Sequence, residues 1–149
     1  MPTLFTIGYE DLPPAQLVAE LQAAGVRRLI DVRFRPQSRR AGMSKTRLGE
    51  FLFAHGITYE HRRSLGTPPE IRGDFKTGAI ARGRAQFAAY VEQTASAELD
   101  ALADEIASGD APPTALMCLE ADPATCHRRV VAEALVERRP EIVVEDLGL

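Results

Sequence analysis

The chain has 149 residues, of which 45% are hydrophobic and 26% charged, and its net charge is −3. These values are typical of a globular protein and exclude a disordered or membrane-spanning chain, because no stretch approaches the ~20 apolar residues of a membrane helix. The acidic balance argues against indiscriminate nucleic-acid binding, which depends on positive charge. The first residues lack the basic and apolar segments of a signal peptide, which predicts a cytoplasmic protein.

The N-terminal half alternates apolar runs with signals for helix starts. Residues 3–8 and 28–33 have the composition of buried strands, and residues 57–60 are expected to form a third strand. One helix is predicted from the Asp11 to Pro14 region to Gly25, and a second is expected between Ser44 and Gly56.

The C-terminal half begins with a segment that has no sustained period. Residues 64–84 are rich in glycine and proline, which predicts a long loop. Residues 85–107 have helical composition with a break near Ser96, and residues 114–119 are strongly apolar, as in a buried strand. Asp122 and Pro123 are expected to start the next helix, and residues 142–144 to form the last strand.

Strands that alternate with helices predict a single α/β domain over residues 1–149. The expected architecture is Rossmann-like, with three layers: a mostly parallel sheet of about five strands and helices on both faces. Ligands of such sheets bind beyond the carboxyl ends of the strands. The loops after Gly8, Arg33 and Leu119 would meet there if the first, second and fourth strands are neighbours, which right-handed crossovers permit.

The junction between the fourth strand and the following helix carries the most reactive side chains. Cys126 and His127 fall near the helix start, where free N–H groups and the dipole lower the pKa of a thiol, and Arg128 adds positive charge. Cys126 is therefore a candidate nucleophile, although its spacing from Val130 equally fits a core position. Cys118 fits a buried apolar position, a second thiol or the disulfide partner of Cys126.

Glu120 and His127 are the candidate acid and base of this junction. Glu120 leaves the carboxyl end of the strand, where catalytic carboxylates occur, or it is an ordinary exposed loop residue. His127 is either a base or a structural histidine. The spacing argues against a metal, because Cys118 and Cys126 are eight residues apart and adjacent Cys126 and His127 would strain to share an ion. We therefore expect no metal and no cofactor.

A second candidate region follows the second strand, in the sequence DVRFRPQSRR. Guanidinium groups bind phosphate or carboxylate bidentately, so Arg33, with Ser38 in a loop stiffened by Pro36, predicts an anion site. Asp31 either orients Arg33 or only completes a buried salt bridge. Gly8 would let the backbone pass close to a ligand, or it serves a tight turn.

Four segments of the chain resemble the domain of unknown function 488 family: TIGYE, DVRFRPQSRR, GITYEHRRSLGTPPE and MCLEADPATCHR. The resemblance spans essentially the whole chain, and Cys-x-Glu followed by Cys-His-Arg carries most of its specificity. Tyr9 stands where we expect histidine, and Thr67 where we expect glycine. The resemblance implies one common site and no particular reaction. The family motif falls on Cys118, Glu120, Cys126, His127 and Arg128, and on Asp31, Val32, Arg33, Pro36 and Ser38.

Two functions fit these residues. The first is an enzyme that binds a phosphate-bearing or other anionic substrate, related to nucleotides or nucleic acids, through Arg33, Ser38 and Arg128. Its reactive groups would come from Cys118, Glu120, Cys126 and His127. The alternative is a non-catalytic nucleotide or nucleic-acid binding module that uses the run from Arg27 to Arg47, which holds eight basic residues and one acid. A regulatory partner domain is a third option.

The gathering of cysteine, glutamate and histidine favours the enzyme over the binding module. The expected partner is an anionic small molecule or nucleotide, with nucleic acid as a further option and no membrane. The sequence predicts no oligomeric state.

Overall fold

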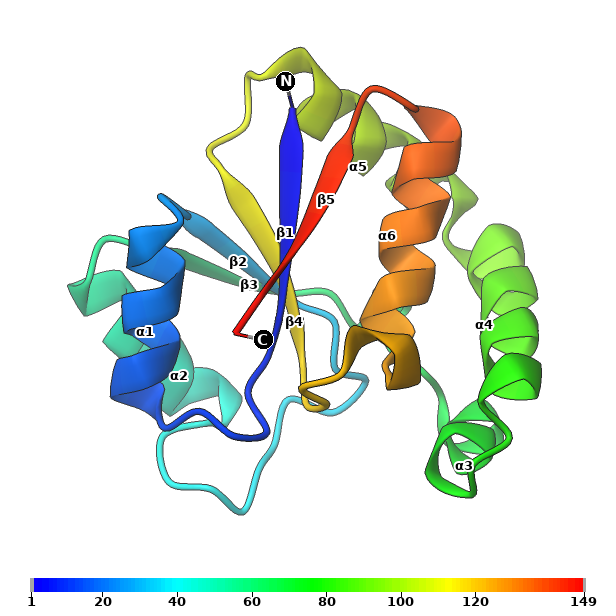
Figure 1. The fold of residues 1–149 in the computed structure, drawn as a ribbon, viewed down its shortest axis with the longest axis horizontal. Helices are drawn as coiled ribbons and strands as arrows, with labels where there is room; N and C mark the ends of the chain where they lie inside the picture. The colour runs from blue at the N-terminus through cyan, green and yellow to red at the C-terminus, as the bar shows by residue number, and fades with distance from the viewer. Residues whose placement is uncertain (1, 149) are drawn as a thin grey trace.

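Five strands form one parallel sheet in the computed structural model, which describes residues 2–148 (Figure 1). The sheet order is β3-β2-β4-β1-β5, and every neighbouring pair is parallel. The predicted Rossmann-like architecture is confirmed, and the first, second and fourth strands are indeed neighbours. The strands are β1 (Thr3–Gly8), β2 (Arg28–Asp31), β3 (Thr58–His61), β4 (Thr114–Cys118) and β5 (Val143–Leu147).

Helices cover both faces of this sheet (Figure 1). Helices α1 (Pro14–Ala23) and α2 (Lys45–Ala54) lie on one face, and α4 (Ile80–Thr94), α5 (Ser96–Ser108) and α6 (His127–Arg138) lie on the other. A shorter helix, α3 (Pro69–Lys76), packs against α4. Within residues 2–148, no helix combines the length and the hydrophobicity that crossing a bilayer would require.

The two hydrophobic cores follow from the alternation of side chains along the strands. Leu29 and Met117 belong to the core under α1 and α2, whereas their neighbours Ile30 and Leu116 belong to the core under the other three helices. Strand β4 is buried at every position because it lies at the centre of the sheet. Its carboxyl end, at Cys118, is therefore held firmly between β1 and β2.

The prediction of a loop over residues 64–84 is wrong. The segment contains helix α3, and helix α4 already begins at Ile80. Pro69 starts α3 at a position where the missing N–H costs nothing, so proline here marks a helix start. Gly78, with φ of +89°, makes the turn between the two helices, and Gly83 lies inside α4 against the ring of Phe75.

The start of α6 also differs from the expectation. Asp122 caps only a short 3-10 turn (Pro123–Thr125), in which the backbone N–H of Ala124 donates to Asp122 Oδ1 over 2.9 Å. Helix α6 itself begins at His127, with Cys126 at its N-cap position. A short 3-10 turn thus separates β4 from α6, and this turn determines the positions of Cys126 and His127.

Candidate functional site: a basic pocket at the carboxyl ends of the strands

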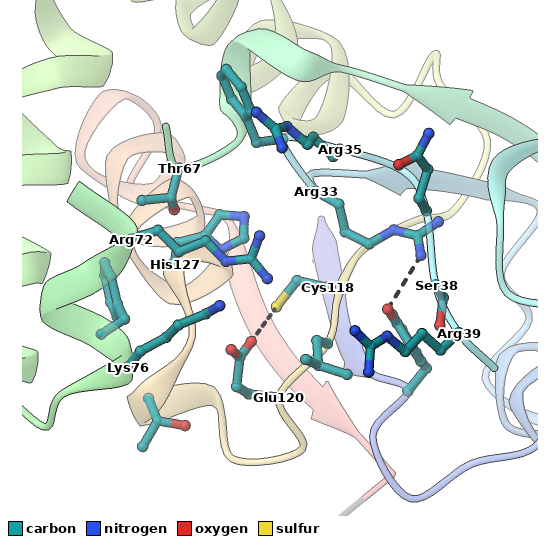
Figure 2. Close-up of a pocket in the computed structure, with 16 residues that line it drawn as sticks. Arg33, Arg35, Ser38, Arg39, Thr67, Arg72, Lys76, Cys118, Glu120 and His127 are labelled. Atoms are coloured by element: carbon teal, nitrogen blue, oxygen red, sulfur yellow. Dashed lines mark hydrogen bonds between the residues drawn. The ribbon is translucent and has the colours of Figure 1, made fainter. Parts of the chain in front are cut away.

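A pocket of about 630 Å³ lies at the carboxyl ends of β1, β2 and β4. The loops after Gly8, Arg33 and Leu119 converge beside it, as the sequence predicts for neighbouring strands. Helix α3 provides the opposite wall. In Figure 2, Arg72 and Lys76 lie on one side of the pocket, Ser38 and Arg39 on the other, and Glu120 between them.

Arg33 is anchored beneath one side of this pocket by Asp31. The guanidinium donates to both carboxylate oxygens of Asp31, with Nη2 to Oδ2 at 2.7 Å and Nε to Oδ1 at 2.9 Å. Its Nη1 donates to the hydroxyl of Tyr9 and to the carbonyl of Met43. Tyr59 donates to Asp31 Oδ2 over 2.5 Å from the neighbouring strand. Asp31 is fully buried and forms a buried ion pair with Arg33.

Charge and burial shift the pKa values of this network. Burial alone would lower the pKa of the Arg33 guanidinium, but the hydrogen bond and negative charge of Asp31 outweigh it and raise that pKa. Burial, followed by the charge of Asp31, raises the pKa of Tyr59. Arg33 therefore stays protonated and Tyr59 neutral, and Arg33 lines the pocket with its charge already compensated.

Four further cations line the pocket without a carboxylate partner. Arg35 and Arg39 come from the loop after β2, and Arg72 and Lys76 come from α3. All four are exposed, and within residues 2–148 none of them forms an ion pair. Glu120 is the one carboxylate among the lining residues. The pocket thus concentrates positive charge in a protein whose net charge is −3.

Cys118 and Cys126 form a disulfide at the floor of the site. Both side chains are almost fully buried, and only Cys118 lines the pocket. The sequence left a core position, a thiol and a disulfide open for these residues. The structure places Cys126 in the hydrophobic core, and it joins the two sulfur atoms across the bend between β4 and α6.

His127 reaches from the first position of α6 to the end of β2. Its Nε2 lies 2.6 Å from the carbonyl oxygen of Val32, and because a carbonyl only accepts hydrogen bonds, Nε2 carries the proton. The Phe87 ring meets the imidazole edge-on at 5.5 Å between centroids. Burial lowers the pKa of His127 to about 4, although the hydrogen bond to Val32 acts in the opposite direction. His127 is therefore neutral near pH 7, with its unprotonated Nδ1 3.9 Å from Cys126 Sγ.

Glu120 lies directly beyond the disulfide. Its Oε2 is 3.7 Å from Cys118 Sγ, and its side chain is partly exposed at the pocket wall. Glu120 is thus the one carboxylate of the pocket lining, and it lies between the unpaired cations of α3 and Arg39 (Figure 2).

Arg128 does not reach the pocket. It is completely buried, and its guanidinium donates to the carbonyls of Glu120 and Ala121 and lies 3.3 Å from Cys118 Sγ. Burial lowers the pKa of its guanidinium. Its contacts fix the loop that presents Glu120, so Arg128 has a positioning role in this structure.

Gly8 and Pro36 support the loops without lining the pocket. A Cβ atom on Gly8 would collide with the backbone carbonyl of Glu120, so glycine here permits a close approach of two chain segments. The carbonyl of Pro36 accepts a hydrogen bond from the backbone N–H of Lys45 over 2.8 Å. Ser38 does line the pocket, and its Oγ accepts a hydrogen bond from the backbone N–H of Arg40.

The sequence did not identify the residues that the α3 region contributes. Arg72 and Lys76 are four residues apart and face the pocket from one side of the helix, a spacing that becomes visible only once α3 is recognised. Thr67 precedes this helix and is 4% exposed, yet its hydroxyl has no hydrogen-bond partner among the described residues. An unpartnered hydroxyl in a pocket wall is free to bind a ligand.

The basic run from Arg27 to Arg47 does not form a single face. Arg28 lies at the opposite end of β2 from the pocket, and its guanidinium pairs with Glu105 over 2.6 Å. Arg40 is bound to the backbone carbonyls of Tyr9 and Leu12.

Comparison with known proteins gives one match. The family model described as "Domain of unknown function DUF488" matches residues 13–135, a range that includes Arg33, the α3 cations and the entire β4–α6 junction. Neither the curated proteins nor the solved structures contain a match to the chain.

Proposed function

We propose that this chain, which belongs to the DUF488 family, is an enzyme that binds a phosphate-bearing substrate, such as a nucleotide, in the basic pocket. The observation that carries the proposal is the set of four unpaired cations, Arg35, Arg39, Arg72 and Lys76, arranged around one carboxylate. Unpaired guanidinium and ammonium groups that face each other across a pocket bind phosphate oxygens with charge-assisted hydrogen bonds.

The size and lining of the pocket support a ligand larger than inorganic phosphate. Its volume of about 630 Å³ lies within the range of roughly 300–1,000 Å³ typical of small-molecule sites. Phe34 and Phe75 line it together with the cations, and aromatic rings provide surfaces on which a nucleobase stacks. Cations for phosphate and rings for a base together favour a nucleotide or the end of a nucleic-acid strand.

Glu120 is the proposed group for proton transfer. It shares the pocket with the cations, and Arg128 donates a hydrogen bond to its backbone carbonyl, which holds the backbone of Glu120 in place without substrate. The sulfur of Cys118 lies 3.7 Å from its Oε2, and neutral His127 lines the same pocket, so these groups form the proposed reactive part of the site. In this proposal the cations bind the substrate, and Glu120, His127 and Cys118 take part in the reaction.

Glu120→Gln separates binding from catalysis. We would incubate the protein with nucleoside mono-, di- and triphosphates and short oligonucleotides, and identify products by mass spectrometry. The variant should lose turnover of any substrate found and retain its binding, because glutamine keeps the shape of the side chain but cannot transfer the proton. Glu70→Gln, on an exposed residue outside the pocket, is the matched control. Full turnover by Glu120→Gln would contradict the proposed role.

A non-catalytic binding module is the second candidate, because Arg35 and Arg39 are exposed at the pocket wall. If the protein binds single-stranded nucleic acid without chemistry, its affinity should fall steeply with salt and should fall when both arginines are replaced by alanine. Arg27→Ala with Arg47→Ala is the control, since both residues are exposed and outside the pocket. Binding that does not respond to salt would exclude this candidate.

A further inference from the structure

We propose that Cys118, Cys126 and His127 bind a zinc-type divalent ion when the two cysteines are reduced. The three ligand atoms, two Sγ and the histidine Nδ1, lie within 4.8 Å of one another. This inference concerns the floor of the site and does not depend on anion binding by the cations above it.

The separation of the sulfur and nitrogen ligands suits a tetrahedral ion, whereas the two sulfurs are bonded to each other in this structure and have to move apart after reduction. Zn–S and Zn–N bonds of roughly 2.3 and 2.05 Å place a sulfur and a nitrogen ligand about 3.6 Å apart, and two sulfurs about 3.8 Å apart. Cys126 Sγ and His127 Nδ1 are already 3.9 Å apart. Two thiolates and one imidazole are also the ligand types that zinc prefers.

The hydrogen bond of His127 prepares its Nδ1 as a ligand. Nε2 donates to the carbonyl of Val32 over 2.6 Å, which leaves the lone pair of Nδ1 on the side of Cys126 Sγ. Metal-binding histidines characteristically donate their other N–H to a carbonyl or carboxylate, which fixes the ring and its tautomer. The edge-on contact with Phe87 holds the same orientation.

Positive charge favours the thiolate forms that a metal needs. Arg128 Nη1 lies 3.3 Å from Cys118 Sγ, and Cys126 occupies the N-cap position of the twelve-residue helix α6. A guanidinium therefore lies beside one sulfur ligand and a helix N-terminus beside the other, and both stabilise negative charge. The charges of two thiolates would balance those of the divalent ion.

The local backbone explains how adjacent residues can share one ion, which the sequence spacing argues against. Cys126 has an extended backbone, with φ of −117° and ψ of 142°, whereas His127 begins a helix. This change of conformation between neighbours brings the two side chains towards one point. Cys118 lies at the end of β4, and the bend formed by the seven intervening residues brings it to Cys126.

Three protein ligands leave a fourth position, and the pocket lies beside it. Cys118 and His127 line the pocket, as does Glu120, whose Oε2 is 3.7 Å from Cys118 Sγ. Zinc sites with three protein ligands and one open position are typical of catalysis, whereas structural sites are closed by four.

The disulfide and the ion exclude each other. Reduction adds two electrons and two protons to the disulfide and yields two thiols; metal binding then releases the two thiol protons. A phosphine reductant supplies the electrons in the experiment below and becomes its oxide with an oxygen atom from water. The Cα atoms of the two cysteines are 7.2 Å apart, beyond the usual range of about 4.4–6.8 Å for a disulfide, so the backbone does not hold the reduced sulfurs in contact.

Cobalt titration of the reduced protein tests the site directly. After reduction and anaerobic removal of the phosphine, one equivalent of Co²⁺ should produce thiolate charge-transfer absorption and the intense visible bands of a tetrahedral complex, and Zn²⁺ should abolish both. Zn²⁺ should also protect both cysteines from alkylation. Cys118→Ser, Cys126→Ser and His127→Asn should each weaken binding by at least about tenfold, whereas His55→Asn, on an exposed residue, should not.

Measurements on the wild-type protein alone can contradict the inference, so the test does not depend on whether the variants fold. Failure to bind Co²⁺ or Zn²⁺, a weakly coloured octahedral complex, or alkylation that zinc does not slow would each contradict it. Unfolding of the protein on reduction, detected by circular dichroism, would also contradict it. Anion binding is measured separately on the oxidised, metal-free protein, so failure of either proposal is recognised independently.

Discussion

The two ends of strand β2 hold arginines in contrasting surroundings. At the amino end, Arg28 pairs with Glu105, whose side chain is 40% exposed, and donates to Thr114 over 3.0 Å. At the carboxyl end, Arg33 pairs with Asp31, whose side chain is fully buried, and additional cations stand nearby without partners. At the amino end of β2 the arginine is therefore paired within the fold, whereas at the carboxyl end several cations remain available to bind a ligand.

Removal of the acidic partner should distinguish the two ion pairs strongly. Asp31→Ala leaves the buried Arg33 guanidinium uncompensated and should lower the free energy of unfolding by about 3–5 kcal/mol. Glu105→Ala removes a half-exposed partner and should cost about 1 kcal/mol or less. Urea denaturation of both variants measures the difference, and equal losses would contradict the contrast between the two ends.

The next effect concerns the unpaired cations. Arg72→Ala combined with Lys76→Ala should weaken adenosine monophosphate binding by about 100-fold, since each charge-assisted hydrogen bond contributes roughly 1.5 kcal/mol or more. Isothermal titration calorimetry measures the affinity. The double variant Arg27→Ala with Arg47→Ala removes the same charge outside the pocket and should bind like the wild type. Equal losses in the two double variants would mean that only net charge matters.

Replacement of two glycines by alanine should change stability by intermediate and contrasting amounts. Gly8→Ala introduces a Cβ into the carbonyl of Glu120 and should destabilise the protein by about 1–3 kcal/mol while displacing Glu120. Gly73→Ala, inside α3, meets no atom within 4 Å and should be neutral or stabilising by up to ~1 kcal/mol. Thermal unfolding distinguishes them, and a Gly8→Ala protein as stable as the wild type would show that the two loops are not tightly packed.

The smallest effect tests the unpartnered hydroxyl. Thr67→Val keeps the shape of the side chain and removes a buried polar group without a partner, so stability should stay constant or rise by about 1 kcal/mol. Affinity for adenosine monophosphate should fall if the hydroxyl binds the ligand. A loss of stability of more than ~1 kcal/mol would instead assign Thr67 a structural hydrogen bond.

The sequence predicted the fold better than the site. Alternating apolar runs identify strands such as residues 3–8 and 114–119, because buried parallel strands are apolar on both faces. The glycines and prolines of residues 64–84 led to the prediction of a loop, so helix α3 and the contribution of Arg72 and Lys76 to the pocket were missed. Arg128 follows Cys126 and His127 in the chain but points into the core from the next position of the helix, so proximity in sequence did not place it in the pocket.

Calorimetry with adenosine monophosphate and adenosine tests whether the unpaired cations bind a phosphate group. We expect the oxidised, metal-free protein to bind the monophosphate, to bind adenosine much more weakly, and to bind the monophosphate less tightly when salt is added. Equal binding of the two compounds, or no binding of the monophosphate at low salt, would contradict it.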